Sequence, residues 1–156
     1  MTMNKQIQKL SAQLSEIEQH LPHFATVNTR VSQVSAGWHL SHCMLTLRKI
    51  IETISASDPA GYKRSFSLSK LLVFTSNNIP RGKGRAPKTV LPTDINEGAL
   101  QNQLQELTRQ VSLLEGLDPN QYFAHPYFGD LKLKEAIRFM EIHTRHHLKI
   151  VREILA

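Results

Sequence analysis

A chain of 156 residues is long enough to bury a hydrophobic core, and we expect one domain over residues 1–156. Its single cysteine, Cys43, excludes an internal disulfide framework and a cysteine-rich zinc site, and no apolar run is long enough for a signal peptide or a membrane span. We therefore expect a cytoplasmic protein, and the net charge of +6 indicates a nucleic-acid partner only where it clusters.

Two helices are predicted in the first third of the chain. Apolar residues from Ile7 to Leu21 recur at spacings of three and four, which predicts a helix over about residues 3–20 that ends before Pro22. Ser35 is a suitable N-cap for a second helix over about 37–55. Because this second helix is apolar on nearly every side, we expect it to be the most buried one.

The middle of the chain predicts a long connection. A short helix over about 67–75 is expected to pack its apolar residues inward, and residues 77–92, with three prolines and two glycines, should be extended and exposed. Two further helices follow, over about 96–114 and about 131–155, separated by a compact aromatic turn at 125–130. Four long helical patterns without a convincing strand pattern predict an all-α fold, an antiparallel four-helix bundle with a long connection between the second and third long helices.

Histidines cluster in the last predicted helix. His143 and His147 are four residues apart and fall within its apolar stripe, whereas His146 falls outside the stripe. Two imidazoles one turn apart can reach the same divalent metal, but they can equally be core histidines with hydrogen-bond partners, or lie at a frayed helix end. The pair is not the zincin motif, because Thr144 stands where that motif has glutamate.

A metal site would need a third ligand, and the second helix offers two histidines. Periodicity places His39 nearer the main apolar stripe, while His42 shares a face with Trp38. Because that helix is apolar nearly all round, periodicity alone leaves both candidates open.

Three motifs together resemble a known family. The motifs are Trp38-His-Leu-Ser-His42-Cys43, His125-Pro-Tyr-Phe-Gly129 and His143-Thr-Arg-His-His147. With them the chain resembles the DinB-like (YfiT-like) metalloprotein superfamily, in particular a branch with an HPxFG turn before an HxxHH helix. The resemblance covers essentially the whole chain. It implies a four-helix bundle that binds a divalent metal through His42, His143 and His147.

The resemblance also implies a type of chemistry. Members of the superfamily are associated with hydrolase reactions and with metal-dependent transfer of thiol cofactors, so the expected substrate is a small molecule, anionic or thiol-containing. Imidazole ligands suit zinc or nickel, and the sequence does not choose between them. The chain departs from the branch at Ile150, where glutamine is frequent, at Lys132, where a Ser or Thr cap is usual, and at Ala136, where tryptophan is frequent.

Several residues near these motifs have two interpretations. His125 could line the mouth of the site or hold the turn beside Pro126, and the turn is the better explanation. His146 could support the ligands or face solvent. Cys43 is better explained as a small buried residue than as a ligand, and Glu135 and Glu141 as charges on a solvated helix face.

The basic stretch supports a competing hypothesis. Arg81, Lys83, Arg85 and Lys88 could attract an anionic substrate or contact phosphates, but no aromatic residues alternate with them, so nucleic-acid binding is the weaker interpretation. A further alternative is a metal-binding or interaction scaffold without enzymatic activity, which could form a homodimer through an exposed face of the first helix.

Overall fold

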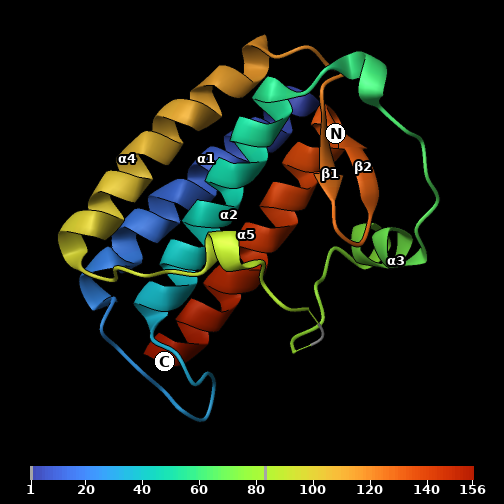
Figure 1. Ribbon diagram of the computed structural model, residues 1–156. Coiled ribbons are helices and arrows are strands. Elements are labelled where there is room, and N and C mark those ends of the chain that lie inside the picture. Colours follow the sequence, from blue (N-terminus) through green and yellow to red (C-terminus); the bar gives the residue numbers. More distant parts are fainter. Residues whose placement is uncertain (1, 83) are drawn as a thin grey trace.

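The computed structural model describes residues 2–82 and 84–156, and the described chain is mostly helical with one small sheet (Figure 1). Its helices and strands are α1 (Met3–His20), α2 (Ala36–Ala56), α3 (Leu68–Ser76), α4 (Glu97–Leu113), β1 (Tyr122–His125), β2 (Gly129–Lys132) and α5 (Leu133–Leu155).

The four long helices surround the core. α2 packs against α5 and α4, and α1 packs against the same two helices. In Figure 1, α1 and α5 run downwards while α2 and α4 run upwards. The neighbours α2 and α5 are therefore antiparallel, whereas α1 with α5 and α2 with α4 are parallel, so the fully antiparallel order that we expected does not hold. The predicted apolar positions of α1 and α4 are buried, including Leu10, Ile17, Leu100 and Leu107 at 0% exposure. Each such side chain contributes roughly 1.5–3 kcal/mol of transfer free energy.

Side-chain caps fix where several helices begin. The Ser35 hydroxyl accepts a hydrogen bond from the Trp38 amide at 3.2 Å, and the Asn96 side chain accepts one from the Ala99 amide at 2.9 Å. The cap at Ser35 was predicted from the sequence. Ser35 fixes the start of α2 only a few residues before His39 and His42.

A β-hairpin stands where only an aromatic turn was expected. β1 and β2 pair antiparallel, with His125 opposite Gly129 at the turn end, and Gly129 adopts a φ of +72° that favours glycine. Strands of four residues are too short to show a period-two pattern, so the expectation of a purely helical chain missed them. Because β2 extends to Lys132, α5 begins at Leu133 rather than at the predicted Leu131.

The short helix α3 packs differently from the prediction. Only Val73 of this helix is buried, while Leu68, Leu71 and Leu72 are 61%, 52% and 61% exposed. α3 lies at the edge of the molecule beside the hairpin, so only one of its faces packs against the rest of the fold (Figure 1). The inward packing that we expected for these three leucines is therefore wrong.

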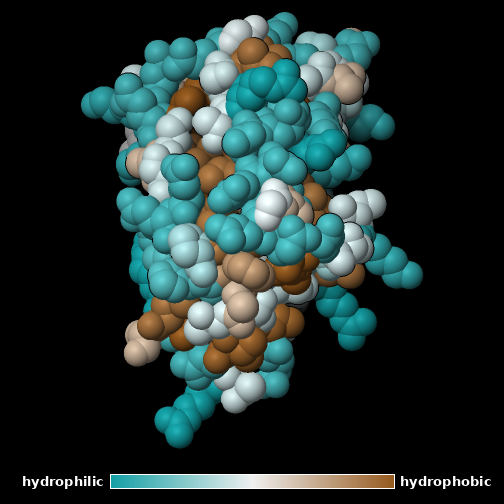
Figure 2. Space-filling model, turned by 90° about the vertical axis from the view of Figure 1, so that its left-hand side faces the viewer, coloured by the Kyte–Doolittle hydropathy of each residue, from teal (hydrophilic) through white to brown (hydrophobic). Residues whose placement is uncertain are grey.

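The connection after α3 is extended, but it is not wholly exposed. Val90, within a 3-10 turn at Lys88–Val90, is buried at 4% exposure. The side of the molecule formed by α4 and α1, at the left of Figure 1, is mostly hydrophilic in its upper part, with hydrophobic residues gathered lower down (Figure 2). Among the described residues, no helix combines the length and apolar character that crossing a membrane would require.

Candidate metal centre

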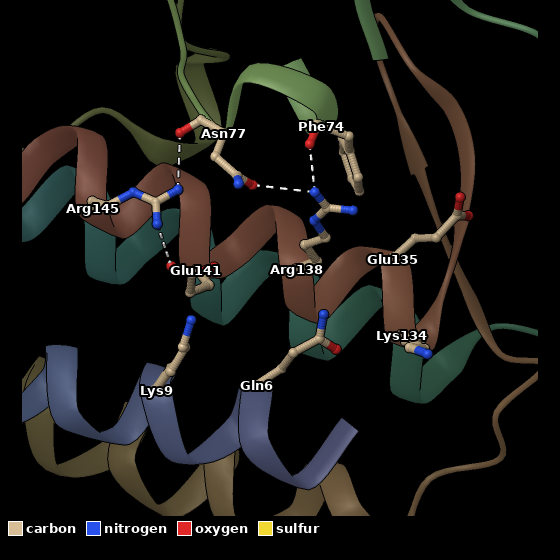
Figure 3. Close-up of a pocket in the computed structure, with 9 residues that line it drawn as sticks. All are labelled: Gln6, Lys9, Phe74, Asn77, Lys134, Glu135, Arg138, Glu141 and Arg145. Atoms are coloured by element: carbon tan, nitrogen blue, oxygen red, sulfur yellow. Dashed lines mark hydrogen bonds and ion pairs between the residues drawn. The ribbon is translucent and has the colours of Figure 1, made fainter. Parts of the chain in front are cut away.

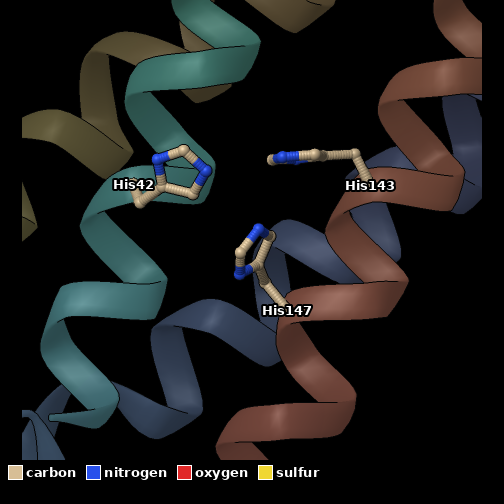
Figure 4. Close-up of side chains that lie close together, drawn as sticks. All are labelled: His42, His143 and His147. Atoms are coloured by element: carbon tan, nitrogen blue, oxygen red, sulfur yellow. The ribbon is translucent and has the colours of Figure 1, made fainter. Parts of the chain in front are cut away.

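Three histidines converge between α2 and α5. His42 projects from α2, and His143 and His147 project from successive turns of α5, so that one ring nitrogen of each lies within 4.8 Å of the others (Figure 4). The spacing of four residues places the α5 pair on one face of the helix, and the packing of α2 against α5 brings His42 opposite that pair. A group of this size and composition could hold a metal ion.

Hydrogen bonds leave one nitrogen of His42 and one of His147 directed at the cluster. His42 Nδ1 lies 2.9 Å from the Val90 carbonyl oxygen and donates to it, so Nε2 carries the free lone pair. His147 Nδ1 lies 3.1 Å from His39 Nδ1, which likewise leaves its Nε2 free. His143 differs, because its buried Nδ1 has no hydrogen-bond partner among the described residues. An unpartnered buried nitrogen beside two free lone pairs fits a bound cation.

His39 belongs to the site without being a member of the three-histidine group. Its Nδ1 contacts His147, and its Nε2 lies 2.9 Å from the Ser32 hydroxyl oxygen. If His147 Nε2 is a ligand, the ring proton of His147 sits on Nδ1 and is donated to His39, and His39 then donates from Nε2 to Ser32. This arrangement is the usual way in which a protein orients a ligating imidazole. Periodicity alone left His39 and His42 open as ligands, and the structure brings His42 into the three-histidine group.

Burial keeps these imidazoles neutral. His42, His143 and His147 are 5%, 8% and 8% exposed. Desolvation lowers the pKa of His143 and of His147 well below the ordinary value, and neighbouring imidazoles lower both further. Desolvation also lowers the pKa of His42, and the hydrogen bond to Val90 opposes part of that shift. Because metal ligation requires the neutral form, the lone pairs remain available below the pH at which a free histidine becomes protonated.

Aromatic rings enclose the cluster. Trp38 stacks on His42 with ring centres 5.1 Å apart and planes 16° apart, and the Phe139 ring centre lies 5.8 Å from that of His143. These apolar neighbours lower the local dielectric constant, which strengthens interactions between a cation and its ligands.

His125 has the structural role that the sequence favoured. Its Nδ1 accepts hydrogen bonds from the amides of Tyr127 and Phe128 at 3.1 and 3.2 Å, and its ring stacks on Phe128 at 4.0 Å. Phe139 lies 4.7 Å from His125 and 5.8 Å from His143, so this phenyl ring touches both imidazoles. His125 therefore supports the wall of the site and holds the hairpin turn.

Two further predictions near the site have opposite outcomes. Cys43 is buried at 1% exposure, its Sγ lies 3.5 Å from the Thr144 hydroxyl, and burial raises the pKa of its thiol to about 12. It is the small buried residue that we expected. Glu141, in contrast, is only 8% exposed and pairs with Arg145 at 2.8 Å, so describing it as a solvated charge was wrong. Glu135 is half-buried and pairs with Lys70 at 2.6 Å.

The basic stretch and His146 lie outside the three-histidine group. Arg81 forms an ion pair with Glu153 on α5 at 2.8 Å, Arg85 is exposed, and Lys83 falls outside the described residues. His146 is half-buried in a hollow on the outer side of α5, which it shares with Arg81 and Lys149. Burial lowers the pKa of His146, and the Arg81 charge lowers it further.

No pattern in the sequence indicates the contact between Ser32 and His39. Ser32 lies in residues 22–37, where no helical or strand period exists, and only the folded loop brings its hydroxyl to the histidine. Two positions at which the chain differs from the branch that it resembles carry side chains that pack in the core. Ile150 and Ala136 are buried in the core at 6% and 0% exposure. At Lys132, Glu135 accepts the backbone amide hydrogen bond at 3.3 Å.

Comparisons with known proteins returned no match: no family model matches the chain, and neither does any curated protein or any solved structure.

Proposed function

We propose that this chain is a DinB-like four-helix-bundle protein that binds one divalent metal through His42, His143 and His147. The observation that carries the proposal is the convergence of three buried, neutral imidazoles from two antiparallel helices, with ligand atoms within 4.8 Å of one another. The ring of contacts among α1, α2, α4 and α5 supports the bundle assignment, and the three motifs named above support the family assignment.

The proposed ion is zinc or nickel, because imidazole is a good ligand for both. Structural zinc sites are usually closed by four protein ligands, so a three-histidine set is more typical of catalytic centres. A divalent ion held in this way keeps a coordination position open and lowers the pKa of a water or thiol that occupies it. The proposed function is therefore that of a metal-dependent enzyme, a hydrolase or a thiol-cofactor transferase.

The surroundings of the cluster favour the thiol-transfer alternative. No carboxylate belongs to the three-histidine group among the described residues, and Glu141 is occupied by Arg145. Hydrolysis usually needs a positioned general base, whereas a thiol becomes a nucleophile once it loses its proton. The protein's own contribution is then to hold His147 through His39, to exclude water with Trp38 and Phe139, and to admit a small thiol or anionic substrate.

Metal analysis tests the binding step. Protein purified without a histidine tag and dialysed against metal-free buffer should contain close to one zinc or nickel ion per chain by mass spectrometry. His42→Ala and His147→Ala should each lose the ion, while His146→Ala should keep it as a matched control on α5. A parent protein without metal that also fails to take up added zinc or nickel would remove the proposal.

A catalytic assay separates the enzyme from a metal-binding scaffold. The metal-loaded protein is incubated with low-molecular-weight thiols and an electrophilic aromatic chloride, and separately with ester and amide substrates. Thiol consumption that depends on His147 supports a transferase, and ester or amide cleavage that depends on it supports a hydrolase. If the loaded protein is inactive in both panels while retaining metal, the scaffold interpretation gains support.

A further inference from the structure

A second hollow lies on another side of α5, away from the histidine cluster. It is bordered by the first turns of α1, the end of α3 and residues 134–145 of α5, and has a volume of about 450 Å³ (Figure 3). Arg138 is five residues from His143, which turns it roughly 140° around the helix. None of the three clustered histidines lines this hollow. It is therefore separate from the candidate metal centre.

The charges that line the hollow do not cancel. Its two carboxylates already have cationic partners, Glu135 with Lys70 at 2.6 Å and Glu141 with Arg145 at 2.8 Å. Three other cationic side chains that line it, Lys9, Lys134 and Arg138, form no ion pair with any described carboxylate. An uncompensated positive site of this kind attracts an anion.

Arg138 is held in place before any ligand arrives. Its Nη2 donates to the Phe74 carbonyl oxygen and, at 3.2 Å, to Asn77 Oδ1, and its guanidinium lies 5.1 Å from the centre of the Phe74 ring. Asn77 ends α3 in the left-handed conformation, with φ at 51°, and this turn directs its side chain towards Arg138. A guanidinium fixed on one side keeps its remaining N–H donors for an anionic group.

A buried amide completes the wall. Gln6 extends from α1 towards α5 below Arg138 and lines the hollow, although the residue is only 5% exposed (Figure 3). Its side-chain Oε1 has no hydrogen-bond partner among the described residues. The Gln6 amide nitrogen points towards Arg138 (Figure 3), so it can donate to the same anionic group as the guanidinium.

We propose that the hollow between α1, α3 and α5 binds a small organic anion, a carboxylate or a phosphate ester. The anionic group lies against Arg138 and the Gln6 amide, with the charges of Lys9 and Lys134 at the two ends of the hollow, and the apolar part lies against Phe74 (Figure 3). The volume is that of a small-molecule site rather than of a bare ion. This proposal is independent of the proposed metal function, because it uses none of the residues of the histidine cluster.

Titration of the full chain tests the proposal. Isotope-labelled protein is treated with a chelator and titrated with phenyl phosphate and with benzoate, and inorganic phosphate and benzyl alcohol serve as the anionic and neutral controls. We expect saturable backbone amide shifts confined to the start of α1, the end of α3 and residues 134–145. Both aromatic anions should bind more tightly than inorganic phosphate, and benzyl alcohol should not bind.

Charge variants provide the decisive comparison. Lys9→Gln and Lys134→Gln change exposed residues and should each weaken phenyl phosphate binding at least fivefold, while Lys49→Gln on α2 makes the same change in net charge and should have little effect. His147→Ala should bind the probe like the parent, so failure here and failure of the metal site are distinguishable. The proposal is overturned if all four variants bind phenyl phosphate equally, or if the amide shifts are scattered over surface lysines. It is also overturned if the aromatic anions bind no more tightly than inorganic phosphate.

Discussion

Replacing His39 probes the orientation of a metal ligand without removing one. In His39→Phe the ring is kept, but His147 Nδ1 loses the nitrogen that lies 3.1 Å away. His147 is 8% exposed, so its donor is left unpaired in a buried position, at a cost of roughly 1–3 kcal/mol. At about 1.4 kcal/mol for each factor of ten, zinc or nickel affinity should fall by about 5- to 150-fold. That range overlaps the loss of about 10- to 100-fold that is typical when the partner of a ligating histidine is removed.

His39→Asn is the matched control for this experiment. The asparagine Oδ1 is attached at the same branch point as histidine Nδ1, so it can accept the hydrogen bond from His147 and should keep metal affinity within a few-fold of the parent. Affinity is measured by competition with a fluorescent zinc chelator at pH 7.5, with thermal unfolding followed to confirm that each variant is folded. The reasoning is refuted if His39→Phe binds metal as tightly as the parent, or if the phenylalanine and asparagine variants lose affinity equally.

Three further predictions concern residues around the site. Burial lowers the pKa of His125 to about 4, below the unfolded value of about 6.5, so its contribution to stability is complete above pH 6.5 and lost as the pH falls towards 4. With allowance for partial exposure, His125 alone should account for about 2 kcal/mol of the stability lost by pH 4.5 in urea unfolding, so His125→Asn should lose about that much less than the parent, and an equal loss in both proteins would contradict this. Because burial raises the pKa of the Cys43 thiol to about 12, a disulfide reagent should modify it only after unfolding, and rapid labelling of the native protein would count against the packing described here. Trp38 is the only tryptophan and stacks on His42, so nickel should quench its fluorescence in the parent but not in His42→Ala, whereas equal quenching in both would place the ion elsewhere.

The long helices could be predicted from the sequence because their signals are local. Apolar spacing, together with the cap at Ser35 for α2, placed α1, α2 and α4 within a residue or two of their observed bounds. The hairpin could not be predicted in this way, since each strand has four residues and its pairing is set by contacts with α5 and by the left-handed Gly129. The exposed leucines of α3 have a similar cause, because a helix at the edge of the fold lacks a second layer to cover it.

Of the candidate site, the inward-facing pair on α5 could be predicted from periodicity, whereas the α2 histidine and the partners supplied by loops could not. The spacing of His143 and His147 within an apolar stripe is a property of one helix, and the structure places both inward. Choosing His42 over His39 required the family resemblance, because α2 is buried on nearly every side and periodicity does not distinguish its faces. Partners supplied by loops, Ser32 for His39 and the Val90 carbonyl for His42, depend on how irregular segments fold back and leave no periodic signal.

The most direct test of the account is a crystal structure of the metal-loaded protein with data collected above and below the zinc or nickel absorption edge. We predict a single anomalous difference peak between α2 and α5, within bonding distance of one nitrogen each from His42, His143 and His147. A peak at other histidines, or no peak in protein shown to contain metal in solution, would contradict the claim that these three residues form the metal centre.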